Sequence, residues 1–305
     1  AEQILAMFLT MAVGFGVVKA GLFKTEDSRI ISNMVVYICN PCVVVHSFQI
    51  ELTDDKIKGL MIAIGLSVVV HMVLIIGSEI LSFIFHFNSI EKASIIYTNA
   101  GYLVIPLVGA VLGEEWVFYT TAFILVQTVL MWTHGVKLIG QEKELNIRKI
   151  LCNPNVIAMI IGIALFALEI RLPTVVDSCV SGFGDMISPA SMMVIGMVIG
   201  DVDLKWVFRQ KRPYLICLLR LIVFPLIAVV AFAGLERSGI HPDAEYILMI
   251  VLIATSAPAA AMITQLAQIY GKDSRYASVI NVMSVIFCII TMPVMVLSYE
   301  MLIAL

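Results

Sequence analysis

Charged residues are scarce in this sequence of 305 residues. Asp, Glu, Lys and Arg make up 13% of it, against roughly 25% in a soluble domain. Hydrophobic residues make up 61%, and the mean hydropathy is +1.02. The net charge of -3 offers no basic surface of the kind that nucleic acid requires. The composition therefore indicates an integral membrane protein and excludes nucleic acid as a partner.

Long polar segments are also missing. The longest polar connection is IGQEKELNIRK (139–149), which leaves no room for a domain outside the bilayer. The six cysteines lie in or beside apolar runs, so a disulfide framework is not expected. CNPC (39–42) has the spacing of a redox or zinc motif but lacks a second pair of ligands. We expect no metal, no cofactor and a function that lies within the bilayer.

A second catalytic carboxylate is absent as well. GFGD (182–185) matches the Gly-x-Gly-Asp pattern of intramembrane aspartic proteases, but such an enzyme needs two carboxylates that share a proton. The other acid of that apolar run, Asp177, lies near its outer end. We therefore expect no enzyme here and interpret Asp185 as a polar residue that faces the bundle interior, on a candidate path for an ion or proton.

Apolar runs of about 20 residues, the length of a membrane-spanning helix, occur ten times. The predicted spans are 3–21, 30–50, 58–85, 92–112, 115–138, 154–171, 173–200, 213–235, 244–271 and 276–303. The 19 Lys and Arg residues are unevenly distributed: 14 lie on loops after odd spans, 4 lie on the opposite side, and Arg220 lies inside span eight. Positive loops stay in the cytoplasm, so this bias predicts a multi-pass protein of the cell membrane with both termini extracytoplasmic.

Prolines recur at a nearly constant offset of about half the chain. Pro41 and Pro106 in spans two and four have counterparts in Pro189 and Pro258 of spans seven and nine. Because each half holds five spans, a second copy would enter the membrane from the opposite side. This predicts two inverted five-helix repeats, residues 1–150 and 151–305. Coincidence is the alternative, because membrane spans commonly carry prolines.

Two interrupted spans at matching positions point to a binding site. Asn99 and Gly101 precede Pro106 in span four, and Thr255 and Ser256 precede Pro258 in span nine. The alternative is a pair of simple proline kinks. Under the functional reading, each helix begins again at its proline and directs its positive end at an anion. We expect no Lys or Arg near either break. The anion would then be held by backbone N–H groups, by the Asn99 amide and by the Ser256 and Thr255 hydroxyls rather than by a salt bridge, with Ile105 and Ala257 also at the site.

Glu79, Arg220 and His71 are further ionisable residues within the predicted spans. Glu79 in span three and Arg220 in span eight correspond under the repeat, and we predict a structural ion pair between them, with snorkelling to the interface as the alternative for each. His71 in span three is interpreted as a satisfied polar residue, with a proton carrier as the alternative.

Several segments together resemble the auxin efflux carrier family, which includes bacterial organic-acid carriers and the plant PIN auxin exporters. They are NAGYLVIP (99–106), NPNVIAMIIG (153–162), PASMMVIG (189–196) and YGKD (270–273), and the resemblance covers essentially the whole chain. The short central loop is similar to that of the prokaryotic members.

The resemblance implies an all-α fold of ten helices with broken, crossing helices four and nine. It also implies a homodimer, whose protomers each have a scaffold domain (spans 1, 2, 6 and 7) and a transport domain (spans 3–5 and 8–10), with spans two and seven at the dimer contact. The asparagine that binds the substrate carboxylate in the exporters matches Asn99, seven residues before Pro106. Gln127 and Asn40 match more weakly. Ala259 stands where plant exporters have a polar residue, which argues against auxin itself.

These observations predict a secondary carrier of a small organic anion or auxin-like carboxylate that works by an elevator-like movement. A cation/proton antiporter of similar fold is one alternative, but such antiporters place aspartates at the crossing. A membrane sensor that binds a ligand without transporting it is the other, and flux measurements would separate it from a carrier.

Overall fold

The structure is a computed structural model that describes residues 2–140, 148, 151–201 and 203–304. Helices account for most of these residues, and no β-strand occurs among them. The predicted cytoplasmic residues Lys143 and Lys149, and residue 150 at the predicted repeat boundary, lie outside the described residues.

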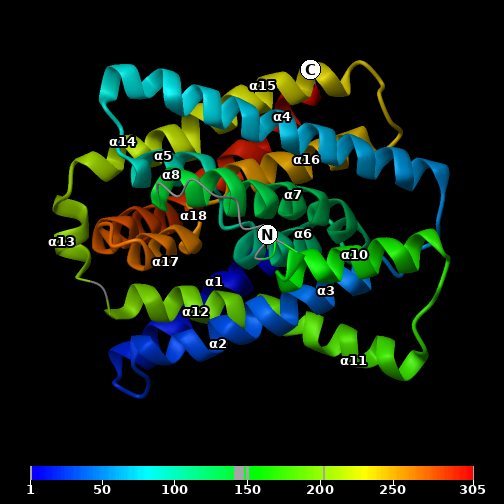
Figure 1. Cartoon of the computed structure of the whole chain (residues 1–305), viewed down its shortest axis with the longest axis horizontal. Coiled ribbons are helices and arrows are strands. Elements are labelled where there is room, and N and C mark those ends of the chain that lie inside the picture. The colour runs from blue at the N-terminus through cyan, green and yellow to red at the C-terminus, as the bar shows by residue number, and fades with distance from the viewer. Residues whose placement is uncertain (1, 141–147, 149–150, 202, 305) are drawn as a thin grey trace. The chain divides into compact units, whose positions relative to one another are not determined.

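The elements are labelled in Figure 1. They are α1 (Glu2–Lys19), η1 (Thr25–Asp27), α2 (Ser28–Met34), η2 (Val35–Cys39), α3 (Asn40–Ser47), α4 (Asp54–Phe85), α5 (Ser89–Ile96), η3 (Ala100–Val104), α6 (Ile105–Val111), η4 (Glu114–Trp116), α7 (Val117–Leu130), η5 (Met131–Gly135), α8 (Val136–Gly140), α10 (Pro154–Ala167), α11 (Thr174–Asp185), α12 (Ile187–Asp201), α13 (Leu204–Arg209), α14 (Arg212–Leu218), η6 (Leu219–Val223), α15 (Phe224–Glu236), α16 (Ala244–Ser256), α17 (Ala261–Ile269) and α18 (Ser274–Ile303).

Each of the ten predicted spans is helical over most of its length. Six continuous helical stretches are long and apolar enough to cross a membrane by themselves, and three shorter apolar helices accompany them. Spans four and nine differ from the others because several non-helical residues interrupt each, Tyr97–Asn99 after α5 in the first case and Ala257–Ala260 between α16 and α17 in the second. The all-helical membrane fold is therefore confirmed, while the number of crossings and their inverted symmetry stay predictions.

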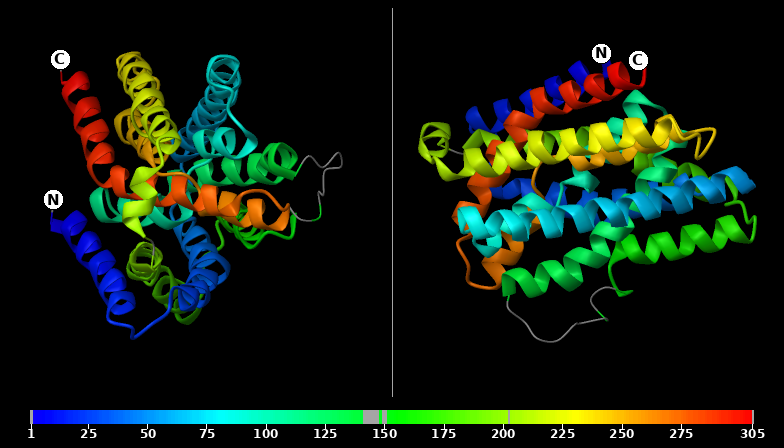
Figure 2. Two further views of the ribbon diagram at one scale, coloured as in Figure 1. Left: turned by 90° about the vertical axis from the view of Figure 1, so that its left-hand side faces the viewer. Right: turned by 90° about the horizontal axis from the view of Figure 1, so that it is seen from above.

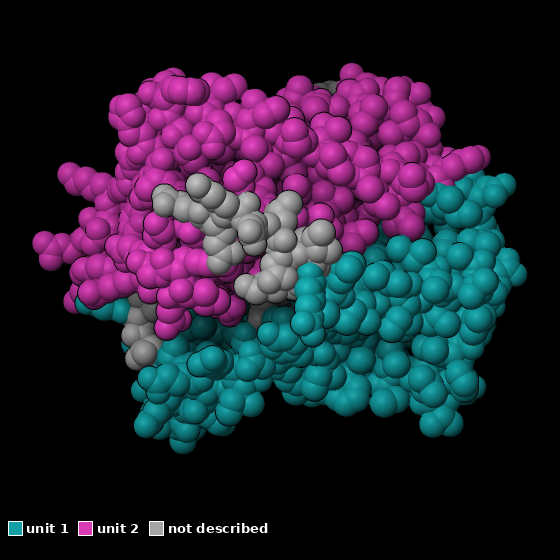
Figure 3. All heavy atoms as spheres, in the orientation of Figure 1, with its two compact units in different colours: residues 1–57, 101–121, 148–204 teal, residues 58–100, 122–147, 205–305 magenta. Residues whose placement is uncertain are grey.

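The helices form two compact units that are interleaved along the chain. Unit 1 comprises residues 1–57, 101–121 and 148–204, and unit 2 comprises residues 58–100, 122–147 and 205–305. Figure 3 colours them separately. Unit 1 thus contains predicted spans one, two, six and seven, and unit 2 contains spans three, eight, nine and ten.

Unit 1 is organised around a close contact between α1 and α12. Gly14 of α1 and Gly196 of α12 lie against the backbone of the opposite helix, at Met193 and Met11 respectively. A Cβ atom at either glycine would overlap a carbonyl oxygen. Any residue larger than glycine would therefore push the two helices apart. Close backbone approach at small residues is typical of helix association in lipid.

In unit 2, the helices α15, α16 and α18 pack on one another (Figure 2). Their shared core is almost purely apolar, and nearly every residue of α16 from Ile247 to Ser256 is buried. This burial places the C-terminal end of α16 in the interior of unit 2, where the chain then leaves the helix.

Three of the prolines that lie inside helical segments directly follow a π-helical turn. Pro41, Pro106 and Pro225 each occupy the second position of a helix that directly follows a π-helical turn, η2, η3 or η6. Proline lacks an N–H and clashes with the carbonyl of the preceding turn, and a widened turn accommodates both defects. The prediction that a helix begins at Pro106 is therefore wrong, because helical structure resumes at Ala100.

Candidate functional site

Two helix breaks meet inside unit 2 and are called here the crossing, defined as Tyr97–Asn99 and Ala257–Ala260. Thr98 pairs with Ala259 as an antiparallel bridge. The Asn99 N–H donates to the Pro258 carbonyl at 2.8 Å, and the Ala260 N–H donates to the Tyr97 carbonyl at 3.0 Å. Extended backbone groups buried away from water must be satisfied, and each break supplies partners for the other.

Proline explains the second break. Pro258 restricts the residue before it to extended conformations, and Ala257 has φ -67° and ψ 155° accordingly. The helix therefore ends at Ser256 and resumes at Ala261, not at Pro258 as predicted. The first break has no proline, and Tyr97 is the counterpart of Pro258, because the carbonyls of these two residues accept the two reciprocal backbone bonds.

The backbone of Thr98 is held by one side chain, that of Gln127 in α7. Gln127 Oε1 accepts from the Thr98 N–H at 2.8 Å and from its hydroxyl at 2.9 Å, while Gln127 Nε2 donates to the Thr98 carbonyl at 2.9 Å. Both the oxygen and the nitrogen of the Gln127 side-chain amide are therefore bonded to Thr98. Gln127 therefore positions the crossing.

Two side chains of α18 do the same for the second break. The Ala259 N–H donates to the Ser284 hydroxyl at 3.0 Å, and Asn281 Nδ2 donates to the Ala259 carbonyl at 2.7 Å. The Ser284 hydroxyl in turn donates to the Asn281 carbonyl. Sequence reasoning missed both residues, because polar residues within a long apolar helix do not reveal which backbone groups they satisfy.

Arg220, in η6, is fully buried beside the crossing. Its Nε donates to the Ala257 carbonyl and its Nη1 to the Ile95 carbonyl, both at 3.1 Å. None of the carboxylates in the described part of the chain forms an ion pair with it. The expectation that no Lys or Arg lies near the breaks is therefore wrong, because a residue far away in sequence reaches both of them.

The predicted ion pair between Glu79 and Arg220 is wrong, because each residue binds other partners. Glu79 binds Lys92 Nζ at 2.7 Å, and nearly half of its side chain is exposed. A nearby, partly solvated ammonium is an easier partner for Glu79 than a guanidinium in the core.

His71, in α4, is also fully buried in unit 2. Its Nδ1 lies 2.7 Å from the Ser67 carbonyl, so in the neutral ring this nitrogen carries the proton. The ring packs on Phe123 with 4.8 Å between centroids. Its Nε2 is buried without a partner among the described residues. The imidazole is thus satisfied on one side only.

The two predicted hydroxyls of span nine differ in what they can still bind. Thr255 donates its hydroxyl proton to the Val251 carbonyl one turn earlier, at 2.7 Å. Ser256 is fully buried, and its hydroxyl has no partner among the described residues. Asn99 uses its backbone N–H at the crossing, and 7% of the residue is exposed. Ser256 and Asn99 therefore have more binding capacity than Thr255.

Asn40, Gly101, Ile105 and Pro106 belong to unit 1. A Cβ atom at Gly101 would lie 2.8 Å from Asn40 Nδ2, so these two predicted residues are brought together. Asn40 Oδ1 is buried without a partner in the described part of the chain. Ile105 and Pro106 are buried, and Pro106 lines a cavity that also includes Asp185 and Glu114.

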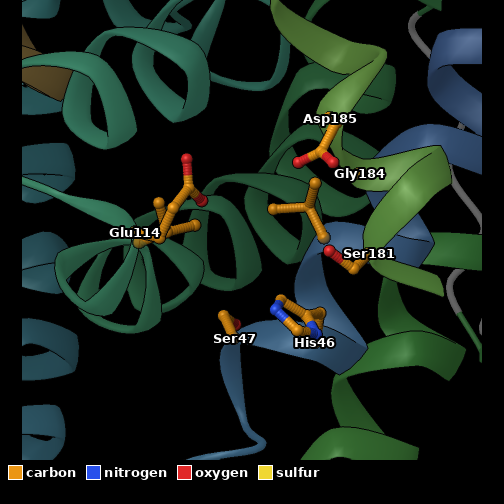
Figure 4. Close-up of a pocket in the computed structure, with 8 residues that line it drawn as sticks. His46, Ser47, Glu114, Ser181, Gly184 and Asp185 are labelled. Atoms are coloured by element: carbon orange, nitrogen blue, oxygen red, sulfur yellow. The ribbon is translucent and has the colours of Figure 1, made fainter. Parts of the chain in front are cut away.

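A smaller cavity of unit 1 is drawn in Figure 4. Glu114 and Asp185 lie on opposite sides of it, with His46 and Ser47 below them in that view. His46 Nδ1 lies 2.9 Å from an Asp177 carboxylate oxygen, and both side chains are about 40% exposed. Asp185 itself is exposed at this cavity rather than enclosed in the helix bundle. Sequence reasoning missed the contact between His46 and Asp177, although the predicted topology puts both residues at span ends on the same side of the membrane.

Another missed cluster joins helices of unit 2 around Glu91. This buried carboxylate accepts from Arg212 Nε at 2.8 Å and from the Tyr276 hydroxyl at 2.7 Å. Asn88 and Glu91 also form a reciprocal capping box at the start of α5, which the sequence NSIE (88–91) displays. The cluster anchors the start of α5.

An apolar, all-helical chain in which two broken helices pair through buried backbone has the features of a multi-pass membrane transport protein. The family model described as membrane transport protein matches residues 1–296. The chain belongs to this family, the auxin efflux carrier family. A search among curated proteins found no significant match.

Proposed function

We propose that this protein is a secondary carrier that moves a small organic anion across the cell membrane. The crossing of unit 2 carries this proposal. It places extended backbone, two helix starts at Ala100 and Ala261, and the polar Asn99 in one region of an otherwise apolar core. Interrupted helices of this kind supply binding groups at mid-membrane in secondary transporters.

The substrate carboxylate is bound by the Asn99 amide, the Ser256 hydroxyl and the first N–H groups of the helices that begin at Ala100 and Ala261. Each helix start has N–H groups without an intrahelical partner and a positive dipole end. Thr98 and Ala259 contribute no free N–H, because Gln127 and Ser284 already bind theirs. Thr255 and Gln127 serve as supports rather than as substrate ligands.

Transport proceeds by an elevator-like movement of unit 2, with both termini extracytoplasmic and a dimer formed through spans two and seven. In support, unit 1 collects spans one, two, six and seven as one compact body. Its helix α11 leaves apolar and small residues exposed, among them Val175, Ser178 and Gly182. Gly184 of the same helix is buried against Val43 of its own protomer and is not part of this exposed face.

The two rival functions make different demands. A cation/proton antiporter needs a carboxylate at the crossing, where the described residues carry Arg220 instead. A sensor would bind the same anions but would not move them. The anion carrier is favoured over the antiporter by the charge at the crossing, and flux measurements decide between carrier and sensor.

The test combines binding and flux with purified protein. Thermal shifts are measured with acetate, lactate, indole-3-acetate, succinate and malate, and radiolabelled uptake of each is measured in proteoliposomes. We expect at least one of these carboxylates to stabilise the protein and to be taken up. Stabilisation without uptake would favour the sensor. The absence of both stabilisation and uptake for every carboxylate tested would contradict the proposal.

Asn99→Ala tests the site itself. Losing a hydrogen bond to a charged group should cost about 1.5 to 3 kcal/mol, or roughly 10- to 150-fold in affinity, while the fold is kept. Asn33→Ala, at an exposed position of α2, is the matched control. Ala257→Asp should abolish anion binding by repulsion. If Asn99→Ala and Ala257→Asp both fold and transport as the parent does, the crossing is not the binding site.

A further inference from the structure

Arg220 is an unusual residue for the interior of a membrane protein. Its side chain is 0% exposed, and the carbonyls of Ala257 and Ile95 are its hydrogen-bond partners. Its remaining nitrogen, Nη2, is buried without a partner among the described residues. A buried charge is costly unless a partner compensates it, and carbonyl oxygens compensate a guanidinium only in part.

The two carbonyls identify what Arg220 acts on. Ile95 lies in the last turn of α5, and Ala257 directly follows α16. Both are C-terminal helix ends, which carry partial negative charge and carbonyls without intrahelical partners. One guanidinium therefore covers the negative ends of both helices that lead into the crossing. The guanidinium is also connected to Asn99: it donates to the Ala257 carbonyl, and the next residue, Pro258, accepts from the Asn99 N–H.

We propose that Arg220 makes the crossing selective for anions, a proposal that rests on the carrier function above. With both negative helix ends covered and a unit positive charge unpaired, the electrostatic field at the crossing is positive. An anion bound there supplies the missing counter-charge, whereas a neutral molecule of the same shape does not. Arg220 is thus a positioning residue that also sets specificity through its charge.

The experiment compares carboxylates with their uncharged amides. Dissociation constants of acetate, lactate and indole-3-acetate, and of acetamide, lactamide and indole-3-acetamide, are measured for the parent, Arg220→Met and Arg220→Lys. Arg220→Met should weaken carboxylate binding about tenfold or more, equivalent to about 1.4 kcal/mol, and change amide binding little. Arg220→Lys keeps the charge and should retain most of the preference for carboxylates. Arg237→Met, which removes an exposed arginine bound to the Leu302 carbonyl, is the control.

Each outcome bears on the proposal. An unchanged carboxylate-to-amide ratio in Arg220→Met, or an equal loss of both ligands, would overturn it, because a purely structural role affects both alike. If Arg220→Met does not fold, Arg220→Gln, which keeps a hydrogen-bond donor but removes the charge, takes its place, and an unchanged ratio there overturns the proposal as well. A parent protein that binds none of the panel would refute the carrier function and this inference together. If the parent binds carboxylates and the carboxylate-to-amide ratio is unaltered in Arg220→Met, only the inference about Arg220 is refuted.

Discussion

The two arms of the crossing have the same backbone role but reach it with different residues. The second arm contains Pro258, and two side chains of α18 hold its backbone. The first arm, Tyr97–Asn99, has no proline, and among the described residues Gln127 is the one side chain that binds its backbone, at Thr98. A helix break in a membrane protein thus does not need a proline, provided that a neighbouring helix satisfies the backbone groups that the break exposes.

Removing Gln127 should have the largest effect, because this one side chain satisfies three polar groups of Thr98. Gln127→Leu leaves the Thr98 N–H, hydroxyl and carbonyl without their partner. We expect a loss of about 3 kcal/mol or more in stability, measured as a lower melting temperature in detergent. Gln265→Leu, at an exposed position of α17, is the control. Equal melting temperatures for the two variants would contradict the supporting role.

The second arm should tolerate the loss of one support better. Ser284→Ala removes the acceptor for the Ala259 N–H but leaves the bond from Asn281 to the Ala259 carbonyl. The expected loss is about 1 to 2 kcal/mol, in the same melting assay. Ser298→Ala, on the same helix and with its hydroxyl bonded to Val294, provides the comparison. A loss as large as that of Gln127→Leu would show that the two arms are not supported differently.

The first arm also requires a small residue after the break. A Cβ atom at Gly101 would meet Asn40 Nδ2 at 2.8 Å, so Gly101→Ala should cost about 1 kcal/mol through overpacking. Adding Asn40→Ala should recover part of that loss in a double-mutant cycle. Gly65→Ala in α4, where a Cβ meets nothing within 4 Å, should not destabilise the protein. Strictly additive effects of the two substitutions would exclude the contact.

Pro258→Ala should have the smallest effect. The bonds from Asn99, Asn281 and Ser284 still hold the second arm extended, so the loss should be only about 0.4 to 1 kcal/mol, chiefly from a more flexible unfolded chain. Carboxylate affinity should stay within about twofold of the parent, measured by titration. A large loss of affinity would contradict this expectation. It would indicate that the helix continues through residue 258 and that the proline itself makes the break.

The sequence predicted the elements better than their ends. Each predicted apolar run is helical over most of its length, but the first break, at Tyr97–Asn99, lies upstream of the helix start predicted at Pro106. Pro106 was assigned the wrong role because a proline in sequence looks the same whether a π-helical turn absorbs it or a helix ends there. The local pattern cannot distinguish the two, since the difference depends on which neighbouring side chains offer hydrogen bonds.

Charge partners were the least predictable part of the site. Repeat symmetry paired Glu79 with Arg220, but Glu79 binds Lys92, 13 residues away in sequence, and Arg220 binds Ile95 and Ala257. Correspondence under a repeat concerns position along the chain and carries no information on which atoms touch.

The sequence by itself determined that this protein is a helical membrane protein of the auxin efflux carrier family, because hydropathy and motif order are properties of the chain alone. Only the tertiary structure decided where the helices break and what surrounds the breaks. Buried N–H and C=O groups must find partners wherever the fold provides them, and Gln127, Arg220, Asn281 and Ser284 come from three different helical spans that the fold brings to one crossing.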